Sequence, residues 1–192
     1  RGEIVVLPTD TVYGIGCDAF DADAVASLLA AKGRGRDMPP PVLIPTARTA
    51  QGLATQVPDY AQRLMERFWP GPLTLVLRRG SRVSREASGG LDTVGLRVPD
   101  HPVALALLRA FGGGGAAPSA NRFGSVSPTT ADHVRAELGG AADFVLDGGP
   151  CEVGVESTIV DATGDTLAIL RPGGVTRESL QDVLGFPLTV PE

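Results

Sequence analysis

The stretch from residue 8 to residue 36 organises the chain, and it reads PTDTVYGIGCDAFDADAVASLLAAKGRGR. The apolar, β-branched run Glu3–Leu7 before it predicts a buried strand, and the proline that follows should end this strand because proline cannot donate to a strand ladder. Hydroxyls and glycines in residues 8–16 then predict a polar turn at the strand's end, where ligands of open α/β sheets usually bind. A helix follows, with Asp21 or Asp23 as its N-cap.

Three cations follow this helix: Lys32, Arg34 and Arg36. Lys32 is the only lysine in the sequence, and an ammonium on a flexible stem can approach phosphate oxygens as a compact charge. The cluster also fits solvated cations that interact favourably with the negative end of the helix dipole at the C-terminus. From these residues alone, a phosphate site and a solvated helix end both remain open.

The composition indicates one globular domain in 192 residues, with 43% hydrophobic and 20% charged residues. A net charge of −5 argues against a broad nucleic-acid-binding surface but leaves room for a local basic groove. Cys17 and Cys151 form neither a disulfide framework nor a paired metal motif, so we expect reduced thiols in a cytoplasmic protein. The sequence has no membrane-spanning apolar run and no signal peptide. Because it begins with arginine, we expect the native N-terminus to be missing.

Apolar runs and capping residues predict alternating strands and helices along the rest of the chain. The expected strands are Val42–Ile44, Leu73–Leu77, Val94–Val98, Ala116–Pro118, Phe144–Leu146, Thr158–Val160 and Leu167–Leu170. The expected helices are one from Thr46 to Thr55, one from Pro58 to Phe68, one ending at Phe111, one capped by Ser127 with Pro128 at its first position and ending at Leu138, and one from Thr176 to Leu184. Several strands follow one another too closely for helical crossovers, so we expect an α/β fold with a mixed parallel and antiparallel twisted sheet flanked by helices.

Several predicted strands end in polar or basic side chains, namely Thr9, Thr11, Arg97, Ser119, Asn121, Ser157 and Arg171. If the sheet brings these ends together with Lys32 and Arg34, they would line one cleft suited to triphosphates and small carboxylates. Hydroxyls and amides at strand ends also make ordinary turns, which is the alternative reading of each one. Arg97 differs, because a cation within an apolar strand needs a partner or a ligand.

Other chemistries fit the sequence poorly. Lys32 is followed by glycine and no Walker A motif occurs, while the four glycines 112–115 do not follow the order of a dinucleotide fingerprint. With only two histidines, His101 and His133, we expect neither a histidine-based metal centre nor a Ser-His-Asp triad. Four carboxylates in predicted turns or strand ends could bind Mg²⁺, but such groups are more often simply solvated: Asp143, Asp147, Glu156 and Asp161.

Taken in order, the motifs resemble those of the YrdC-like family. They are PTDTVYGIGCDAF, KGR, WPGPLTLVL, GLRVPDHP, APSAN, SPT, DGG, GVESTIVD and ILRPGG, and they extend from Ile4 to about Leu184. The chain is similar to the short, single-domain bacterial type, and the resemblance implies the L-threonylcarbamoyladenylate synthase reaction. In that reaction L-threonine, bicarbonate and ATP give threonylcarbamoyl-AMP and pyrophosphate. A partner transferase then modifies adenosine 37 of tRNA.

The resemblance also implies roles for individual residues. Lys32 and Arg34 would be the catalytic cations, holding the ATP phosphates or the threonine carboxylate. Further ATP contacts would be Ser119, Asn121, Ser127, Thr129 and Arg171, and the threonine contacts would be Thr9, Arg97, His101 and Ser157. Mg²⁺ would accompany ATP, and no protein metal ligand is assigned. The sequence departs from the family pattern at Leu43, where some members have histidine, and in the run Pro39–Pro41.

The residues leave two other functions open. One is a double-stranded RNA or tRNA-binding module without catalysis, whose backbone contacts would be Lys32, Arg34, Arg36, Arg97 and Arg122. Such binding would weaken strongly with salt. The other is the carbamoyl transfer of hydrogenase maturation proteins, which ranks third because the zinc-finger and acylphosphatase domains of those proteins are absent from this sequence.

Overall fold

The computed structural model describes residues 3–32, 41–83, 88, 91–120 and 126–188, with Ala31 and Lys32 described by their backbone only. Its strands are β1 Val5–Leu7, β2 Gly14–Asp18, β3 Val42–Leu43, β4 Ala54–Thr55, β5 Leu73–Arg79, β6 Thr93–Arg97, β7 Gly115–Ala116, β8 Phe144–Val145, β9 Thr158–Asp161 and β10 Ala168–Arg171. Its helices are α1 Ala22–Lys32, α2 Ala47–Leu53, α3 Asp59–Phe68, α4 Pro102–Phe111, α5 Ala131–Leu138 and α6 Arg177–Leu184, with a 3₁₀ turn at Gly139–Ala141. No helix within these ranges is long and apolar enough to cross a membrane.

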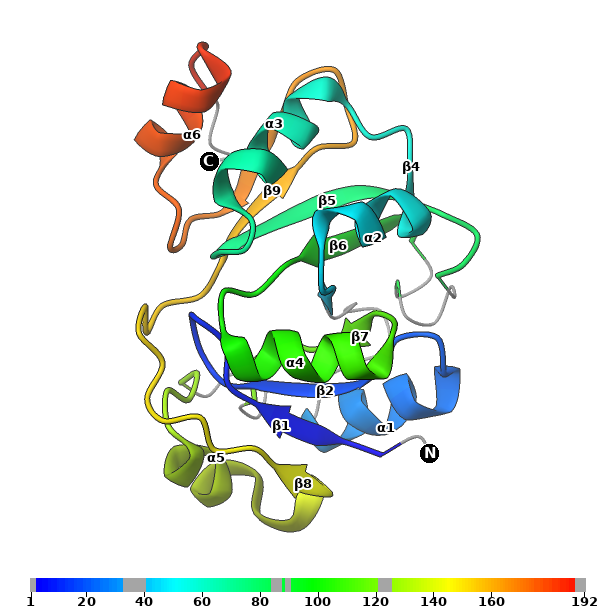
Figure 1. Cartoon of the computed structure of the whole chain (residues 1–192), viewed down its shortest axis with the longest axis vertical. Helices are drawn as coiled ribbons and strands as arrows, with labels where there is room; N and C mark the ends of the chain where they lie inside the picture. Colours follow the sequence, from blue (N-terminus) through cyan, green and yellow to red (C-terminus); the bar gives the residue numbers. More distant parts are fainter. Residues whose placement is uncertain (1–2, 33–40, 84–87, 89–90, 121–125, 189–192) are drawn as a thin grey trace.

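The strands form one mixed sheet in the order β10-β9-β5-β6-β3-β7-β2-β1-β8, and β4 pairs with β5 outside this path. Figure 1 shows two halves: β5, β6 and β9 with α2, α3 and α6, and β1, β2 and β7 with α1, α4 and α5. We call them the β5 half and the β2 half. The short strand β3 joins them, since it pairs parallel with β6 and antiparallel with β7. The expected α/β fold with a mixed, helix-flanked sheet is confirmed.

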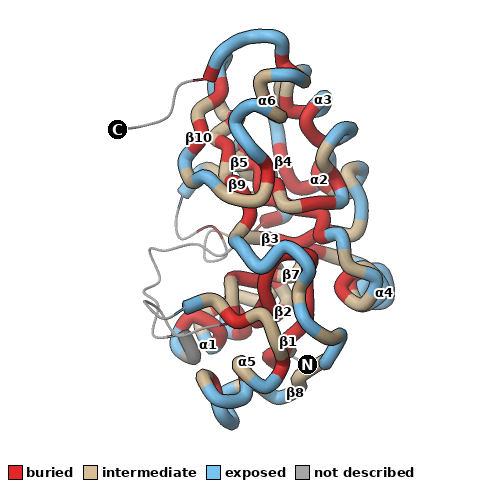
Figure 2. The backbone as a smooth tube through the Cα atoms, turned by 90° about the vertical axis from the view of Figure 1, so that its left-hand side faces the viewer, coloured by how far each residue is buried: buried red, intermediate tan, exposed pale blue. Residues whose placement is uncertain are grey.

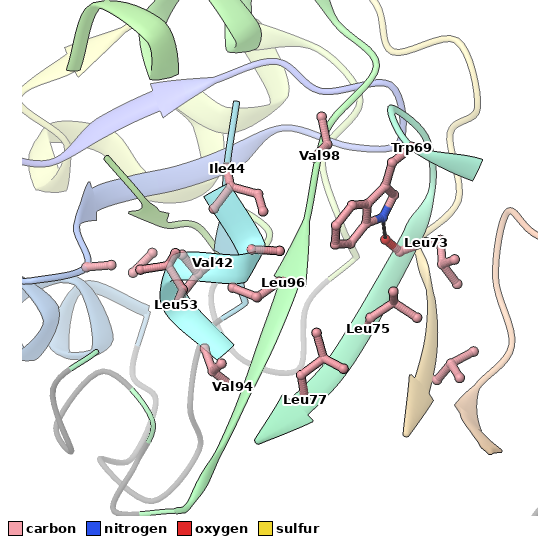
Figure 3. Close-up of a cluster of buried hydrophobic side chains, with 14 of the residues drawn as sticks. Val42, Ile44, Leu53, Trp69, Leu73, Leu75, Leu77, Val94, Leu96 and Val98 are labelled. Atoms are coloured by element: carbon pink, nitrogen blue, oxygen red, sulfur yellow. Dashed lines mark hydrogen bonds between the residues drawn. The ribbon is translucent and has the colours of Figure 1, made fainter. Parts of the chain in front are cut away.

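The core of the β5 half explains why β5 lies inside the sheet. Leu73, Leu75 and Leu77 of this strand are fully buried, as is Leu96 of β6, and Figure 3 shows them side by side. An apolar strand gains most when both of its edges and both of its faces are covered. β5 meets this condition by pairing antiparallel with β6 and parallel with β9. At its start, Trp69 Nε1 donates to the carbonyl of Leu73 at 2.7 Å.

The β2 half has its own packing. Figure 2 shows buried residues along β1 and β2 in this half and along β5 and β9 in the other. Helix α4 packs on the strands through Ala104 and Leu108, which form an apolar cluster with Leu7 and Leu43. The helix therefore covers the side of β1 and β3 on which Leu7 and Leu43 lie.

Strand β2 was not expected, because residues 8–16 were predicted to be a polar turn. Gly14–Asp18 instead lies between β1 and β7 in the sheet. A Cβ at Gly16 would lie 3.2 Å from Leu7 Cδ2, so a glycine here lets the strand pass close to its neighbour. The glycines that resembled a turn signal serve a close strand contact.

The predicted start of α5 is also wrong. Thr130, and not Ser127, is its N-cap, and its side chain accepts from the His133 N–H at 3.2 Å. Pro128 precedes the helix, and its carbonyl accepts from the Tyr13 N–H at 2.8 Å. The helix predicted to reach Thr55 ends at Leu53 because Ala54 and Thr55 pair with β5.

The other capping predictions are confirmed. Asp21 Oδ1 accepts from the N–H groups of Asp23 and Ala24 at the start of α1. Thr46 caps α2 and Thr176 caps α6. The remaining predicted strands are present, with ends shifted by one or two residues.

Candidate active site

A cleft of about 330 Å³ lies between the β5 half and the β2 half. Its polar walls come from segments far apart in the chain: Thr9 and Thr11 after β1, Thr74 on β5, Arg97 at the end of β6, Ser119 after β7, Glu156 and Ser157 before β9, and Arg171 at the end of β10. The sheet thus brings together six of the seven strand-end residues named in the sequence analysis, and the seventh, Asn121, lies outside the described residues. The cleft offers two guanidinium groups and several hydroxyls around a space large enough for small anionic molecules.

Arg97 is the buried cation of the cleft. Only 6% of Arg97 and of Asp10 is exposed, and the two form an ion pair through Asp10 Oδ1. Arg97 Nε donates to the Gly71 carbonyl and Nη1 donates to Thr11 Oγ1, each at 3.0 Å. Asp10 Oδ1 also accepts from the Asp100 N–H at 3.1 Å. Burial lowers the pKa of the Arg97 guanidinium, and the carboxylate of Asp10 acts in the opposite direction.

The turn after β1 is held by its own hydroxyls. Thr9 Oγ1 donates to the Val12 carbonyl at 2.6 Å and accepts from the Thr11 N–H at 3.2 Å. The backbone carbonyls of Asp10 and Thr11 accept from the N–H groups of residues 153 and 154 at 2.9 and 3.0 Å. Thr9 therefore makes the turn that strand-end hydroxyls usually make, and it lines the cleft as well.

Arg171 and Ser157 form the opposite wall. Nε and Nη2 of Arg171 donate to the Ser157 carbonyl at 3.1 and 2.7 Å, and Ser157 Oγ lies 2.8 Å from Thr74 Oγ1. The backbone after Arg171 packs against this segment so closely that a Cβ at Gly173 would lie 2.6 Å from the Thr158 nitrogen. A glycine at position 173 is therefore required by close backbone contact.

Glu156 has partners that the sequence did not reveal. Its Oε2 lies 2.9 Å from Arg171 Nη1, and its Oε1 accepts a hydrogen bond from Ser127 Oγ. Ser127 precedes α5, which belongs to the β2 half. Arg171 ends β10, which pairs with β9 of the β5 half. The carboxylate thus bridges the two halves at the cleft. Ser127 lies 29 residues before Glu156 in the chain, so no local sequence pattern indicates this hydrogen bond.

The predicted site residues divide into three groups. Five line the cleft, namely Thr9, Arg97, Ser119, Ser157 and Arg171. Three lie outside its lining, and the first of them, Ser127, reaches the cleft through Glu156. The carbonyl of Thr129 accepts from the Cys151 N–H at 2.9 Å. The Nδ1 of His101 accepts from the Val103 N–H at the start of α4. The third group, the side chain of Lys32 with Arg34 and Asn121, lies outside the described residues, as do Arg36, Arg122 and residues 38–40.

Sequence reasoning missed two groups that shape the cleft. The sequence pattern gives Asp10 no role, and it leaves Glu156 as one of four carboxylates that could bind Mg²⁺ or be solvated. Leu43, where the family pattern can have histidine, is 2% exposed and gives the cleft an apolar wall. The described residues contain no cluster of three or more acidic, histidine or cysteine side chains placed to hold a metal ion.

Residues 1–173 match a family model, Sua5/YciO/YrdC, described as telomere recombination. A Mycobacterium tuberculosis relative is 50% identical over 184 residues, which cover 96% of this chain and 84% of that protein. The threonylcarbamoyl-AMP synthase of Bacillus subtilis is 46% identical over 186 residues, covering 96% of this chain and 54% of its own length.

The crystal structure of Pyrococcus abyssi Sua5 complexed with L-threonine superimposes with a TM-score of 0.96 at 43% identity, covering 99% of this chain and 56% of that one. The chain therefore spans just over half the length of the Bacillus and Pyrococcus proteins. Escherichia coli YciO gives a TM-score of 0.84 at 26% identity, covering 93% of this chain and 87% of that one.

Proposed function

The chain belongs to the Sua5/YciO/YrdC family, and on that footing we propose that it synthesises threonylcarbamoyl-AMP from L-threonine, bicarbonate and ATP. Relatives from Bacillus subtilis and Pyrococcus abyssi carry the name of this activity, and a Pyrococcus Sua5 crystal structure holds L-threonine. The observation that carries the proposal is the cleft, where Arg97 and Arg171 face a space walled by hydroxyls.

The proposed chemistry needs positioning more than it needs a reactive protein group. The amine of threonine and bicarbonate condense to a carbamate with loss of water. A carbamate oxygen then attacks the α-phosphorus of ATP, and pyrophosphate leaves. All three reactants are anionic or become so, and fixed cations and hydroxyls in a cleft can align them and offset their charge. No covalent intermediate with the protein is required.

Under this proposal the two arginines have different tasks. Arg97, which Asp10 and Gly71 fix on one side, would bind the carboxylate or carbamate of threonine together with Thr9 and Ser157. Arg171 and Ser119 would face the nucleotide. Lys32 and Arg34 keep the phosphate-binding and catalytic roles that the family motif implies. The remaining nucleotide contacts that the motifs imply are Asn121 and Ser127, while His101 and Thr129 would have structural roles.

Mg²⁺ would enter with ATP. The described part of the cleft supplies one carboxylate, Glu156, and this group is already bound to Arg171 and Ser127. That donor set fits an ion held mainly by phosphate oxygens, because Mg²⁺ prefers hard oxygen ligands and retains much of its hydration. The product would pass to a tRNA threonylcarbamoyl transferase in the cytoplasm.

The test is pyrophosphate release from ATP by the purified protein, with threonine and bicarbonate each present or omitted. Release that requires both is expected. Arg171→Gln should reduce it strongly, whereas Arg177→Gln, on an exposed position of α6 six residues later, should leave it unchanged. Release that does not depend on threonine would contradict the proposal.

The RNA-binding alternative gains little from the described residues. Arg97, one of its proposed contacts, is 6% exposed and is bound by Asp10, Thr11 and Gly71. If pyrophosphate release is absent, salt-dependent binding of double-stranded RNA becomes the measurement that decides between the two functions.

A further inference from the structure

The groups that are candidates to bind the nucleotide at one end of the cleft already hold an anion of the protein itself. Glu156 accepts from Ser127 Oγ through one oxygen and pairs with Arg171 Nη1 at 2.9 Å through the other. A carboxylate and a phosphate present the same kind of charged oxygen to a guanidinium and a hydroxyl. Glu156 therefore satisfies the donors that a phosphate group would use.

Arg171 is fixed from its other edge. Its Nε and Nη2 donate to the Ser157 carbonyl, and Nη2 also lies 3.2 Å from Ser157 Oγ. The turn that follows it is anchored as well, since the Gly174 N–H donates to the Glu156 carbonyl at 3.0 Å. An incoming ligand thus meets a guanidinium whose orientation is set by the backbone before the ligand arrives.

Glu156 is the member of this group that can move. Its side chain is 34% exposed, and it lies in the segment before β9 that has no helix or strand. Turning the carboxylate outward breaks one ion pair and one hydrogen bond and returns the charge to water. Turning Arg171 away would instead break its bonds to the backbone of Ser157.

We propose that Glu156 is an internal competitor for the nucleotide: in the free protein its carboxylate occupies the position of a phosphate group between Arg171 and Ser127, and ligand binding displaces it. The ligand class is a polyphosphate. The inference rests on the proposed function for the identity of the natural ligand. The competition itself concerns only the charge and the donors of this site.

The substitution Glu156→Gln removes the charge and keeps the size and one carbonyl acceptor. Binding of inorganic pyrophosphate and of ATP is measured by calorimetry, once in EDTA and once with Mg²⁺. Without the competing charge, the variant should bind pyrophosphate about tenfold more tightly in EDTA, because a like charge within a few ångströms of the site is removed. Threonine binding should not change. Glu156→Ala, as a second variant, should shift pyrophosphate binding in the same direction.

The matched control is Glu152→Gln, which removes the same charge from an exposed position in the same segment. It should change pyrophosphate affinity less than twofold. Weaker binding by Glu156→Gln in both buffers would overturn the inference and make Glu156 a positioning residue for Arg171. Unchanged binding in EDTA together with weaker binding in Mg²⁺ would overturn it and make Glu156 a metal ligand.

The two proposals fail separately. Tighter pyrophosphate binding by Glu156→Gln, combined with no threonine-dependent turnover, would support the competition and contradict the proposed synthase activity. Equal affinity of the variant and the unmodified protein, or no pyrophosphate binding by either, would overturn the competition whatever the turnover assay shows.

Discussion

The buried pair of Asp10 and Arg97 gives the sharpest stability prediction. Replacing Asp10 with alanine leaves a guanidinium that is 6% exposed without its counter-charge, and it also removes the acceptor of the Asp100 N–H. Removing one partner of a buried ion pair costs about 3–5 kcal/mol. The two remaining hydrogen bonds of Arg97, to Gly71 and Thr11, do not offset a whole charge. We expect Asp10→Ala to lower the free energy of unfolding by about 3 kcal/mol or more.

Urea denaturation measures this loss directly, and thermal unfolding should show a drop of roughly 10 °C for a domain of this size. Asp10→Asn separates the charge from the hydrogen bonds, because the amide oxygen can still accept from Arg97. It should lie between the unmodified protein and Asp10→Ala.

A double-mutant cycle tests the reasoning itself. Arg97→Met alone leaves the Asp10 carboxylate buried without its counter-charge, whereas Asp10→Asn combined with Arg97→Met leaves neither charge buried. The double variant should therefore lose less stability than the sum of the two single variants. Additive losses, or an Asp10→Ala protein within 1 kcal/mol of the unmodified one, would refute the claim that the pair is coupled and desolvated.

Three further predictions concern other parts of the molecule. Thr130→Ala should destabilise the protein by about 1 kcal/mol in urea denaturation because it removes the N-cap of α5, and Ser127→Ala should not fray that helix in amide hydrogen exchange. Gly173→Ala should cost roughly 2 kcal/mol or more, since its Cβ would lie 2.6 Å from a backbone nitrogen, while Gly140→Ala has open space and should be near neutral in the same assay. Burial raises the pKa of Cys17 to about 12. At pH 8 the alkylation of Cys17 by iodoacetamide, measured by mass spectrometry, should therefore be roughly a thousandfold slower in the folded protein than in urea. Labelling of Cys17 at equal rates in both states would count against this.

The features predicted correctly from sequence are those whose causes are local. Thr46 and Thr176 each cap a helix by accepting a hydrogen bond from the N–H three residues later in the chain. The apolar run Leu73–Leu77 itself indicates a buried strand, and its leucines are buried. The confirmed strand ends followed from prolines and polar residues beside apolar runs. The expectation that these polar ends meet in one cleft came from their positions at strand ends, and the family resemblance added their roles toward ATP or threonine.

The features missed depend on contacts between distant segments. Asp10 and Arg97 are 87 residues apart, and nothing near Asp10 shows that it will face a buried arginine. A partial signal was present, because an arginine within an apolar strand needs a partner or a ligand, and Asp10 lies three residues after the first predicted strand. Gly14 and Gly16 looked like a turn because their use in β2 depends on neighbours that only the folded sheet reveals, namely Pro118 beside Gly14 and Leu7 beside Gly16.

The placement of β5 between β6 and β9 has a consequence for folding on the ribosome. β6 follows β5 closely and can form an antiparallel hairpin with it early, but the parallel partner of Leu73 is Thr158. While the intervening chain is being made, one edge of this strand, with its buried leucines, has unpaired N–H and C=O groups, which is the condition for misassociation with another nascent chain. The cleft also forms late in synthesis, because Ser157 and Arg171 are among the last of its lining residues to be made. We therefore expect fragments that stop before β9 to aggregate rather than to form a partial site.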